Sequence, residues 1–200
     1  MFDEPFRARI APLLSAVATP LARRGVTPNH ITILACVLGL VAAAMVAAGW
    51  PRLGVALWLL SRLGDGIDGV LARQGGTATS FGGYLDITLD MAAYTAMVVG
   101  FAATAPALWL GWLSVLAGYI LVITTTLALS DASRAQGRRV SGTDRTFQFT
   151  PGLTEAGETN AMYVLWAVFP ALLPWLVWIW AAALAVTAVQ RTYLAARHLA

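Results

Sequence analysis

Two acidic stretches, SRLGDGIDGVLAR at residues 61–73 and GGYLDITLD at residues 82–90, lie inside segments that are otherwise apolar enough to cross a membrane. Each stretch holds one pair of aspartates, Asp65 with Asp68 and Asp86 with Asp90. Spacings of three and four residues place both members of a pair on one face of a helix. A carboxylate at membrane depth is costly in free energy unless it is paired, hydrated or bound to a cation.

The counter-charge for these acids is best explained by bound cations. The chain contains no lysine and has few arginines near these acids, so divalent cations are the simplest counter-charge. Mg²⁺ and Mn²⁺ prefer such oxygen ligands, and the stretches predict a metal-dependent membrane enzyme.

The rest of the composition places the chain in the membrane class. Its 200 residues are 58% hydrophobic and 12% charged, with a mean hydropathy of +0.71. Apolar runs predict six transmembrane helices, at roughly 30–50, 52–73, 82–104, 107–130, 157–173 and 174–197, each near the ~20 residues that cross a bilayer. We therefore expect an all-α integral membrane fold, with residues 27–200 as one six-helix domain. Residues 1–26 are expected to form a juxtamembrane amphipathic helix at the interface, with a loosely ordered tail as the alternative.

Arginine placement predicts the orientation. Arginines precede the first span and fill the loop at 131–156, whereas the opposite side carries only Arg52. The positive-inside rule then puts both termini and the acidic site on the cytoplasmic side of a bacterial inner membrane. No soluble basic face is present, so nucleic acid is not an expected partner. The eight tryptophans are interpreted mainly as an aromatic belt at the membrane interface.

Both acidic stretches belong to one continuous pattern. Asp-x2-Asp-Gly-x2-Ala-Arg-x8-Gly-x3-Asp-x3-Asp runs from Asp65 to Asp90, with eight fixed positions. It resembles the signature of the CDP-alcohol phosphatidyltransferases, the integral membrane enzymes of phospholipid synthesis. The resemblance extends to a Thr-Pro-Asn-x2-Thr segment at residues 27–32, where Thr27 is a predicted helix N-cap and Pro28 the first helical residue.

This resemblance implies a role for each motif residue. Asp65, Asp68 and Asp86 would hold two divalent cations, Mg²⁺ or Mn²⁺, while Asp90 would complete the cluster and act as general base. The CDP group of the donor would be bound by Asn29, Thr32, Asp65, Gly69, Ala72, Arg73 and Gly82. The implied reaction transfers the phosphatidyl group of CDP-diacylglycerol to the hydroxyl of a small polar alcohol and releases CMP. The resemblance also implies a homodimer.

The acceptor alcohol remains open on the sequence. A phosphorylated acceptor, such as glycerol 3-phosphate or inositol phosphate, could be bound by Arg134, Arg138, Arg139 and Arg145. These arginines could equally reflect the positive-inside bias alone. Glu155 and Glu158 could receive an amine acceptor, or simply lie where carboxylates are favoured, at a helix N-terminus.

Three other functions compete with this prediction. A CDP-linked small alcohol of the choline or ethanolamine type could be the donor and a diacylglycerol-like lipid the acceptor, although such relatives are usually longer. An ion or proton transporter could use buried carboxylates, but its acids would be spread across the membrane rather than gathered in one half. A structural membrane protein with a decayed site is disfavoured because all eight signature positions are intact.

Overall fold

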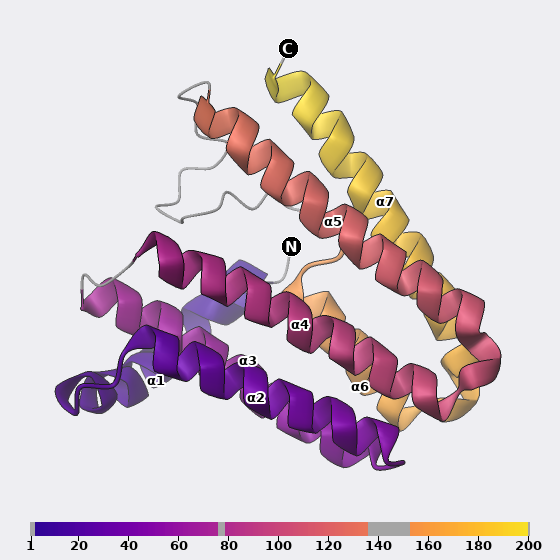
Figure 1. Cartoon of the computed structure of the whole chain (residues 1–200), viewed down its shortest axis with the longest axis horizontal. Coiled ribbons are helices and arrows are strands. Elements are labelled where there is room, and N and C mark those ends of the chain that lie inside the picture. Colours follow the sequence, from indigo (N-terminus) through magenta and orange to yellow (C-terminus); the bar gives the residue numbers. More distant parts are fainter. Residues whose placement is uncertain (1–2, 76–78, 136–152, 200) are drawn as a thin grey trace. The chain divides into compact units, whose positions relative to one another are not determined.

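The computed structural model describes residues 3–75, 79–135 and 153–199, and every regular element in these residues is a helix. The chain divides into two compact units, Phe2–Ala107 and Leu108–Ala200, which we call the N-terminal unit and the C-terminal unit. Figure 1 labels the helices of each. The expected all-α class is confirmed for the described residues.

Four helices form the N-terminal unit: α1 (Asp3–Arg23), α2 (Pro28–Ala47), α3 (Pro51–Gln74) and α4 (Ser80–Thr104). Helix α2 packs against both α3 and α4, and α1 packs against α3. The predicted start of α2 is confirmed, since Thr27 is its N-cap and Pro28 its first residue. Proline suits this position because the first helical N–H groups have no partner inside the helix.

Glycines allow α2 to approach its two neighbours closely. A Cβ atom at Gly54 of α3 would lie 2.6 Å from the carbonyl oxygen of Ala42, and one at Gly100 of α4 would lie 2.6 Å from that of Ala43. Both separations are too short for a real side chain, so a glycine is needed at each crossing. Small residues are the usual means by which apolar helices pack in lipid. The two acidic stretches are thereby held against the same helix.

The amphipathic segment predicted for the N-terminus is a helix in the structure. Ala18 of α1 is fully buried against Val70 and Leu71, in the half of α3 that carries the aspartates. Leu14 and Leu21 border this small core. Helix α1 therefore supports the acidic part of α3 by apolar packing.

Three α-helices form the C-terminal unit: α5 (Trp109–Ala135), α6 (Ala156–Val168) and α7 (Leu173–Leu199). Two short 3-10 turns accompany them, η1 (Pro106–Leu108) and η2 (Pro170–Leu172). Helix α5 packs along α7, and a buried tyrosine links all three helices. The Tyr119 hydroxyl lies 3.0 Å from that of Tyr163 on α6 and accepts a 3.2 Å hydrogen bond from the indole N–H of Trp180 on α7.

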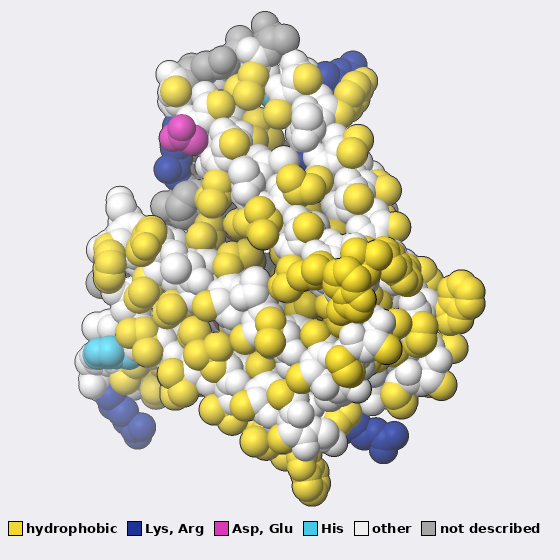
Figure 2. Space-filling model, turned by 45° about the vertical axis from the view of Figure 1, so that its right-hand side comes forward, with side chains coloured by type: hydrophobic (Ala, Val, Ile, Leu, Met, Phe, Trp, Pro, Cys, Tyr) yellow, Lys and Arg dark blue, Asp and Glu magenta, His cyan; other side chains and the backbone are white. Residues whose placement is uncertain are grey.

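The helices have the length and surface of an integral membrane protein. Four segments are long and apolar enough to span a bilayer: Pro28–Ala47, Ser80–Thr104, Pro106–Ala135 and Pro170–Leu199. Apolar side chains are spread over the face drawn in Figure 2, and few charged side chains lie among them. The other two predicted spans, α3 and α6, are not both long and apolar enough to be included among these four segments. Helix α3 carries two aspartates and three arginines, and α6 has 13 residues, only about 20 Å of helix.

Candidate metal centre

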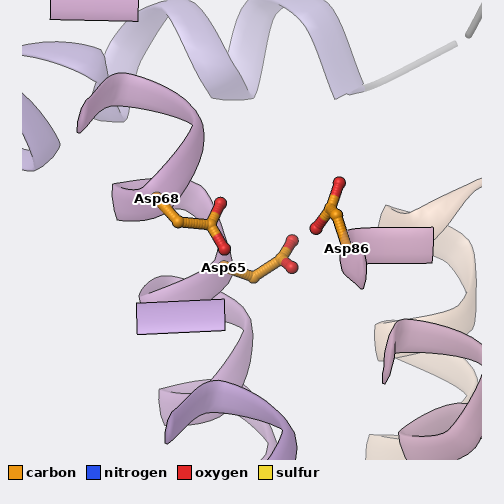
Figure 3. Close-up of side chains that lie close together, drawn as sticks. All are labelled: Asp65, Asp68 and Asp86. Carbon is orange, nitrogen blue, oxygen red and sulfur yellow. The ribbon is translucent and has the colours of Figure 1, made fainter. Parts of the chain in front are cut away.

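Three carboxylates converge in the N-terminal unit. Asp65 and Asp68 come from α3 and Asp86 from α4, and one oxygen of each lies within 4.8 Å of the other two. Figure 3 shows the three side chains directed toward one another. Asp68 is buried and the other two are half-buried. Hard carboxylate oxygens at this spacing suit Mg²⁺ or Mn²⁺, so these residues fit the predicted cation site.

The local sequence explains why these side chains meet. Asp65 and Asp68 share one face of α3 because they are three residues apart. The start of α4 is fixed by Thr79, whose hydroxyl oxygen accepts a 3.0 Å hydrogen bond from the N–H of Gly82. This N-cap stabilises the start of α4. From α4, the Asp86 carboxylate is directed toward those of Asp65 and Asp68.

A residue of α2 also reaches this cluster. The hydroxyl of Thr32, which is buried, donates a 2.6 Å hydrogen bond to Oδ2 of Asp68. Such a bond restricts the rotation of a carboxylate that is to act as a ligand. The Thr-Pro-Asn-x2-Thr segment and the aspartate pattern are therefore parts of one site in the folded chain.

Asp90 has a different environment from the other three aspartates. Its Oδ1 lies 2.5 Å from Nη1 of Arg62, and it does not belong to the set of oxygens within 4.8 Å of one another. The same Arg62 nitrogen lies 3.9 Å from Oδ1 of Asp65. Arg62 therefore supplies part of the positive charge that balances these carboxylates, which the sequence predicted to come from divalent cations. The prediction that Asp90 completes the metal cluster is untested, and so is its role as a base.

Arg62 is the residue that sequence reasoning missed. A signal for it exists, because Arg62 precedes Asp65 by three residues and so shares its helix face. An arginine within a predicted span also requires an anionic partner.

The predicted donor-binding residues lie on α2, α3 and α4, the helices that carry Thr32 and the three aspartates. A Cβ atom at Gly82 would lie 3.2 Å from Oδ1 of Asn29, which places the start of α4 beside the start of α2. A Cβ atom at Gly69 would lie 3.3 Å from Nη1 of Arg73, so the Arg73 side chain runs back along α3 over this glycine. Ala72 occupies the last turns of α3, half-buried. Their contacts with a nucleotide stay a prediction.

The predicted acceptor-binding residues are described only in part. Arg138, Arg139 and Arg145 lie outside the described residues, and Arg134 is exposed in the last turn of α5. Glu155 is the N-cap of α6, and its backbone N–H donates a 3.1 Å hydrogen bond to Oε2 of Glu158. This reciprocal capping explains both glutamates as helix-starting residues.

Comparison with known proteins agrees with this geometry. The family model of CDP-alcohol phosphatidyltransferase matches residues 25–190. The inner membrane protein YnjF of Escherichia coli (strain K12) is 36% identical over 177 residues, which cover 86% of this chain and 84% of that protein. The phosphatidylinositol phosphate synthase of Mycobacteroides abscessus is 31% identical over 198 residues, covering 94% of this chain and 85% of the synthase.

A solved structure has the same fold. The phosphatidylinositol phosphate synthase of Mycobacterium tuberculosis, in complex with manganese and citrate, superposes with a TM-score of 0.75 at 24% identity. The superposition covers 91% of this chain and 88% of that one. The same protein with CDP-DAG bound gives a TM-score of 0.74 at 23% identity, covering 92% of this chain and 94% of the other.

The family match includes both acidic stretches and the whole Thr-Pro-Asn-x2-Thr segment. It confirms the expected enzyme class and its integral membrane character. The expected Mg²⁺ or Mn²⁺ cofactor is likewise supported, because the family depends on divalent cations and the acidic cluster is in place. The chain belongs to the CDP-alcohol phosphatidyltransferase family, as its motif predicted.

Proposed function

We propose that this protein transfers the phosphatidyl group of CDP-diacylglycerol to the hydroxyl of a phosphorylated polyol and releases CMP. The observation that carries the proposal is the convergence of Asp65, Asp68 and Asp86, which belong to the same motif as most of the predicted donor-binding residues. A pyrophosphate donor requires such a site, because its oxygens must be neutralised before CMP can leave.

The residues of the site have separate roles in binding the cations and the donor. Asp65, Asp68 and Asp86 would hold two divalent cations, with Asp90 completing the cluster, and the cations would stabilise negative charge on the pyrophosphate. Thr32 orients Asp68. Asn29, Gly69, Ala72, Arg73 and Gly82 surround the CDP group of the donor.

Asp90 serves as the general base. An alcohol is a weak nucleophile at neutral pH, so a carboxylate within reach must take its proton as it attacks. The hydroxyl oxygen bonds to the phosphorus that carries the diacylglycerol. The bond from this phosphorus to the CMP oxygen breaks, and CMP leaves with the electron pair.

The acceptor is proposed on two grounds. Several relatives are named phosphatidylinositol phosphate synthases, whose product carries a phosphorylated polyol. The chain itself concentrates Arg134, Arg138, Arg139 and Arg145 in one segment, and guanidinium groups bind phosphate bidentately. An amine acceptor is the less favoured alternative, because Glu155 and Glu158 are engaged in capping α6.

We further propose that the chain spans the membrane six times, as the sequence predicts. Helices α3 and α6 complete six spans together with the four apolar ones, because the aspartates of α3 face protein and ligand rather than lipid. Helix α1 lies at the cytoplasmic interface, with both termini and the acidic site on that side.

A homodimer is expected, and mass measurement in nanodiscs tests it. A species of twice the chain mass supports the dimer, and a clean monomer contradicts it.

An acceptor panel tests the proposed function. Purified protein in nanodiscs is given labelled CDP-diacylglycerol, Mg²⁺ and one alcohol at a time: inositol phosphate, glycerol 3-phosphate, inositol, serine, choline or ethanolamine. Mass spectrometry identifies the new lipid. We expect product with a phosphorylated polyol. Product with CDP-choline and diacylglycerol, but not with CDP-diacylglycerol, would instead establish the reversed substrate pairing.

A further inference from the structure

Arg62 of α3 is a buried cation at the edge of the acidic cluster. Its side chain is only 9% exposed. The guanidinium carbon lies 4.5 Å from the ring centroid of Trp58 and 5.3 Å from that of Tyr94. The two rings pack edge to face with their centroids 4.8 Å apart, so the guanidinium lies against one aromatic pair. Nη2 donates a 3.1 Å hydrogen bond to the hydroxyl of Ser61. These contacts stabilise a positive charge at a depth where an unpaired arginine is costly in free energy.

The charge of Arg62 acts on two of the four motif aspartates. Nη1 lies 2.5 Å from Oδ1 of Asp90 and 3.9 Å from Oδ1 of Asp65. Both aspartates belong to the predicted cation site, Asp65 through the converging oxygens and Asp90 through the motif. A guanidinium at these distances offsets part of the repulsion among the carboxylates, and partial burial strengthens the effect. A divalent cation bound by the same carboxylates is repelled by the same guanidinium.

We propose that Arg62 is a built-in counter-charge, which shares Asp65 and Asp90 with the divalent cations. It stabilises the fold when cation is scarce, and it lowers the affinity of the site for cation. Arg62 is not one of the eight motif positions, so this role is additional to the family pattern. The role rests on the cation site of the proposed function and is independent of the acceptor.

Mn²⁺ binding measures the effect on affinity without requiring turnover. The full-length protein in nanodiscs is titrated with Mn²⁺ and followed by electron paramagnetic resonance. Arg62→Gln should bind Mn²⁺ roughly tenfold more tightly than the wild type, because a positive charge beside the ligands has been removed. Arg62→Lys keeps the charge and should stay within about threefold of the wild type.

Arg52→Gln is the matched control for this titration. It removes the same charge from the exposed beginning of α3, ten residues and about 15 Å of helix away from Arg62. Its Mn²⁺ affinity should stay within about threefold of the wild type, because solvent and salt screen an exposed charge. Unchanged affinity in Arg62→Gln overturns the proposal, and so does an equal gain in Arg52→Gln.

Thermal unfolding separates a counter-charge from a packing role. Arg62→Gln should lower the unfolding temperature more in excess EDTA than in saturating Mn²⁺, by about 3 °C or more, because tighter Mn²⁺ binding offsets part of the loss. A residue that only packs against Trp58 and Tyr94 would lower it equally in both conditions, and that result overturns the proposal. Arg62→Met, whose unbranched apolar side chain suits the same rings, is the second variant. If neither variant folds in saturating Mn²⁺, the proposal is contradicted, because bound cation should offset the loss.

Failure of the cation site itself gives a different result. Asp86→Asn should weaken Mn²⁺ binding by at least about tenfold, because Asp86 is one of the converging carboxylates. If Asp86→Asn and the wild type give the same titration, Mn²⁺ does not bind at the cluster, and the proposed function and the role of Arg62 both fail. If Asp86→Asn weakens binding while Arg62→Gln changes nothing, the cation site stands and the counter-charge proposal alone fails.

Discussion

Thr32 of α2 donates a 2.6 Å hydrogen bond to Asp68 of α3, and this bond joins the two motifs of the chain at one carboxylate. The sequence places them 36 residues apart, so only the packing of α2 against α3 brings them together. The bond restricts the orientation of the Asp68 carboxylate, one oxygen of which lies within 4.8 Å of oxygens of Asp65 and Asp86.

Replacing Thr32 should therefore weaken the cation site. Thr32→Val keeps the size and branching of the side chain and removes the hydroxyl donor. Loss of such a supporting bond typically costs 10- to 100-fold in metal affinity or activity, so the Mn²⁺ concentration for half-maximal CMP release should rise by about tenfold. Thr32→Ser retains the hydroxyl and is the matched control. A Thr32→Val variant with the wild-type Mn²⁺ dependence would show that the bond does not orient a ligand.

Substitutions of Asp90 and Asp68 should have different effects on turnover and on ligand binding. Asp90→Asn should lose about 100-fold or more in turnover while still binding CDP-diacylglycerol, because a general base typically contributes that much to the rate. Asp68→Asn should weaken cation and donor binding as well as turnover. Equilibrium binding of labelled CDP-diacylglycerol, measured beside steady-state rates, separates the two. Near-normal turnover of Asp90→Asn would assign the base to another residue.

Charge reversal in the polar loop tests the acceptor. If arginines bind its phosphate, the Arg138→Glu/Arg139→Glu variant should raise the acceptor KM far more than the donor KM, because a ground-state contact is lost. The control is Arg23→Glu/Arg24→Glu, which changes the net charge by the same amount. Arg23 is the last residue of α1 and Arg24 follows it, and both are exposed. Equal effects of both variants would mean that the loop arginines serve only as topology signals.

The close approach of α2 and α4 at Gly100 should affect the free energy of unfolding. Gly100→Ala places a Cβ where only 2.6 Å separates it from the Ala43 carbonyl oxygen, and overpacking of this kind typically costs about 1–3 kcal/mol. Val99→Ala, on the neighbouring exposed position, should have little effect. Thermal unfolding in detergent compares them. A Gly100→Ala variant as stable as Val99→Ala would place the two helices further apart than the structure does.

Three of the four aspartates singled out in the sequence converge in the fold. The sequence indicated them because spacing alone aligns Asp65 with Asp68, and because a charged residue in an apolar segment is conspicuous. It predicted the partners of these acids poorly. Arg62 was overlooked among the motif letters, although its exposure in the fold is low and its partner is Asp90. Helical spacing gives neighbours within a helix, but contacts between α3 and α4 depend on packing that no single segment encodes.

The tryptophans show the same limit. All eight were interpreted mainly as an interfacial belt, and Trp50, Trp109 and Trp175 are indeed exposed. Trp58 is instead fully buried against the Arg62 guanidinium, and Trp112 and Trp166 form an edge-to-face pair inside the C-terminal unit. Composition cannot separate these roles, because an indole suits both a membrane interface and a buried site with a polar partner.

Dependence of the reaction on the carboxylate cluster is tested by CMP release from CDP-diacylglycerol, measured in nanodiscs with and without divalent cation. We expect no CMP release in excess EDTA and full recovery with Mg²⁺ or Mn²⁺ in the presence of a competent acceptor. We also expect Asp86→Asn to be inactive at cation concentrations that saturate the wild type. CMP release at an undiminished rate in excess EDTA, or by Asp86→Asn, would contradict a reaction centred on the Asp65, Asp68 and Asp86 carboxylates.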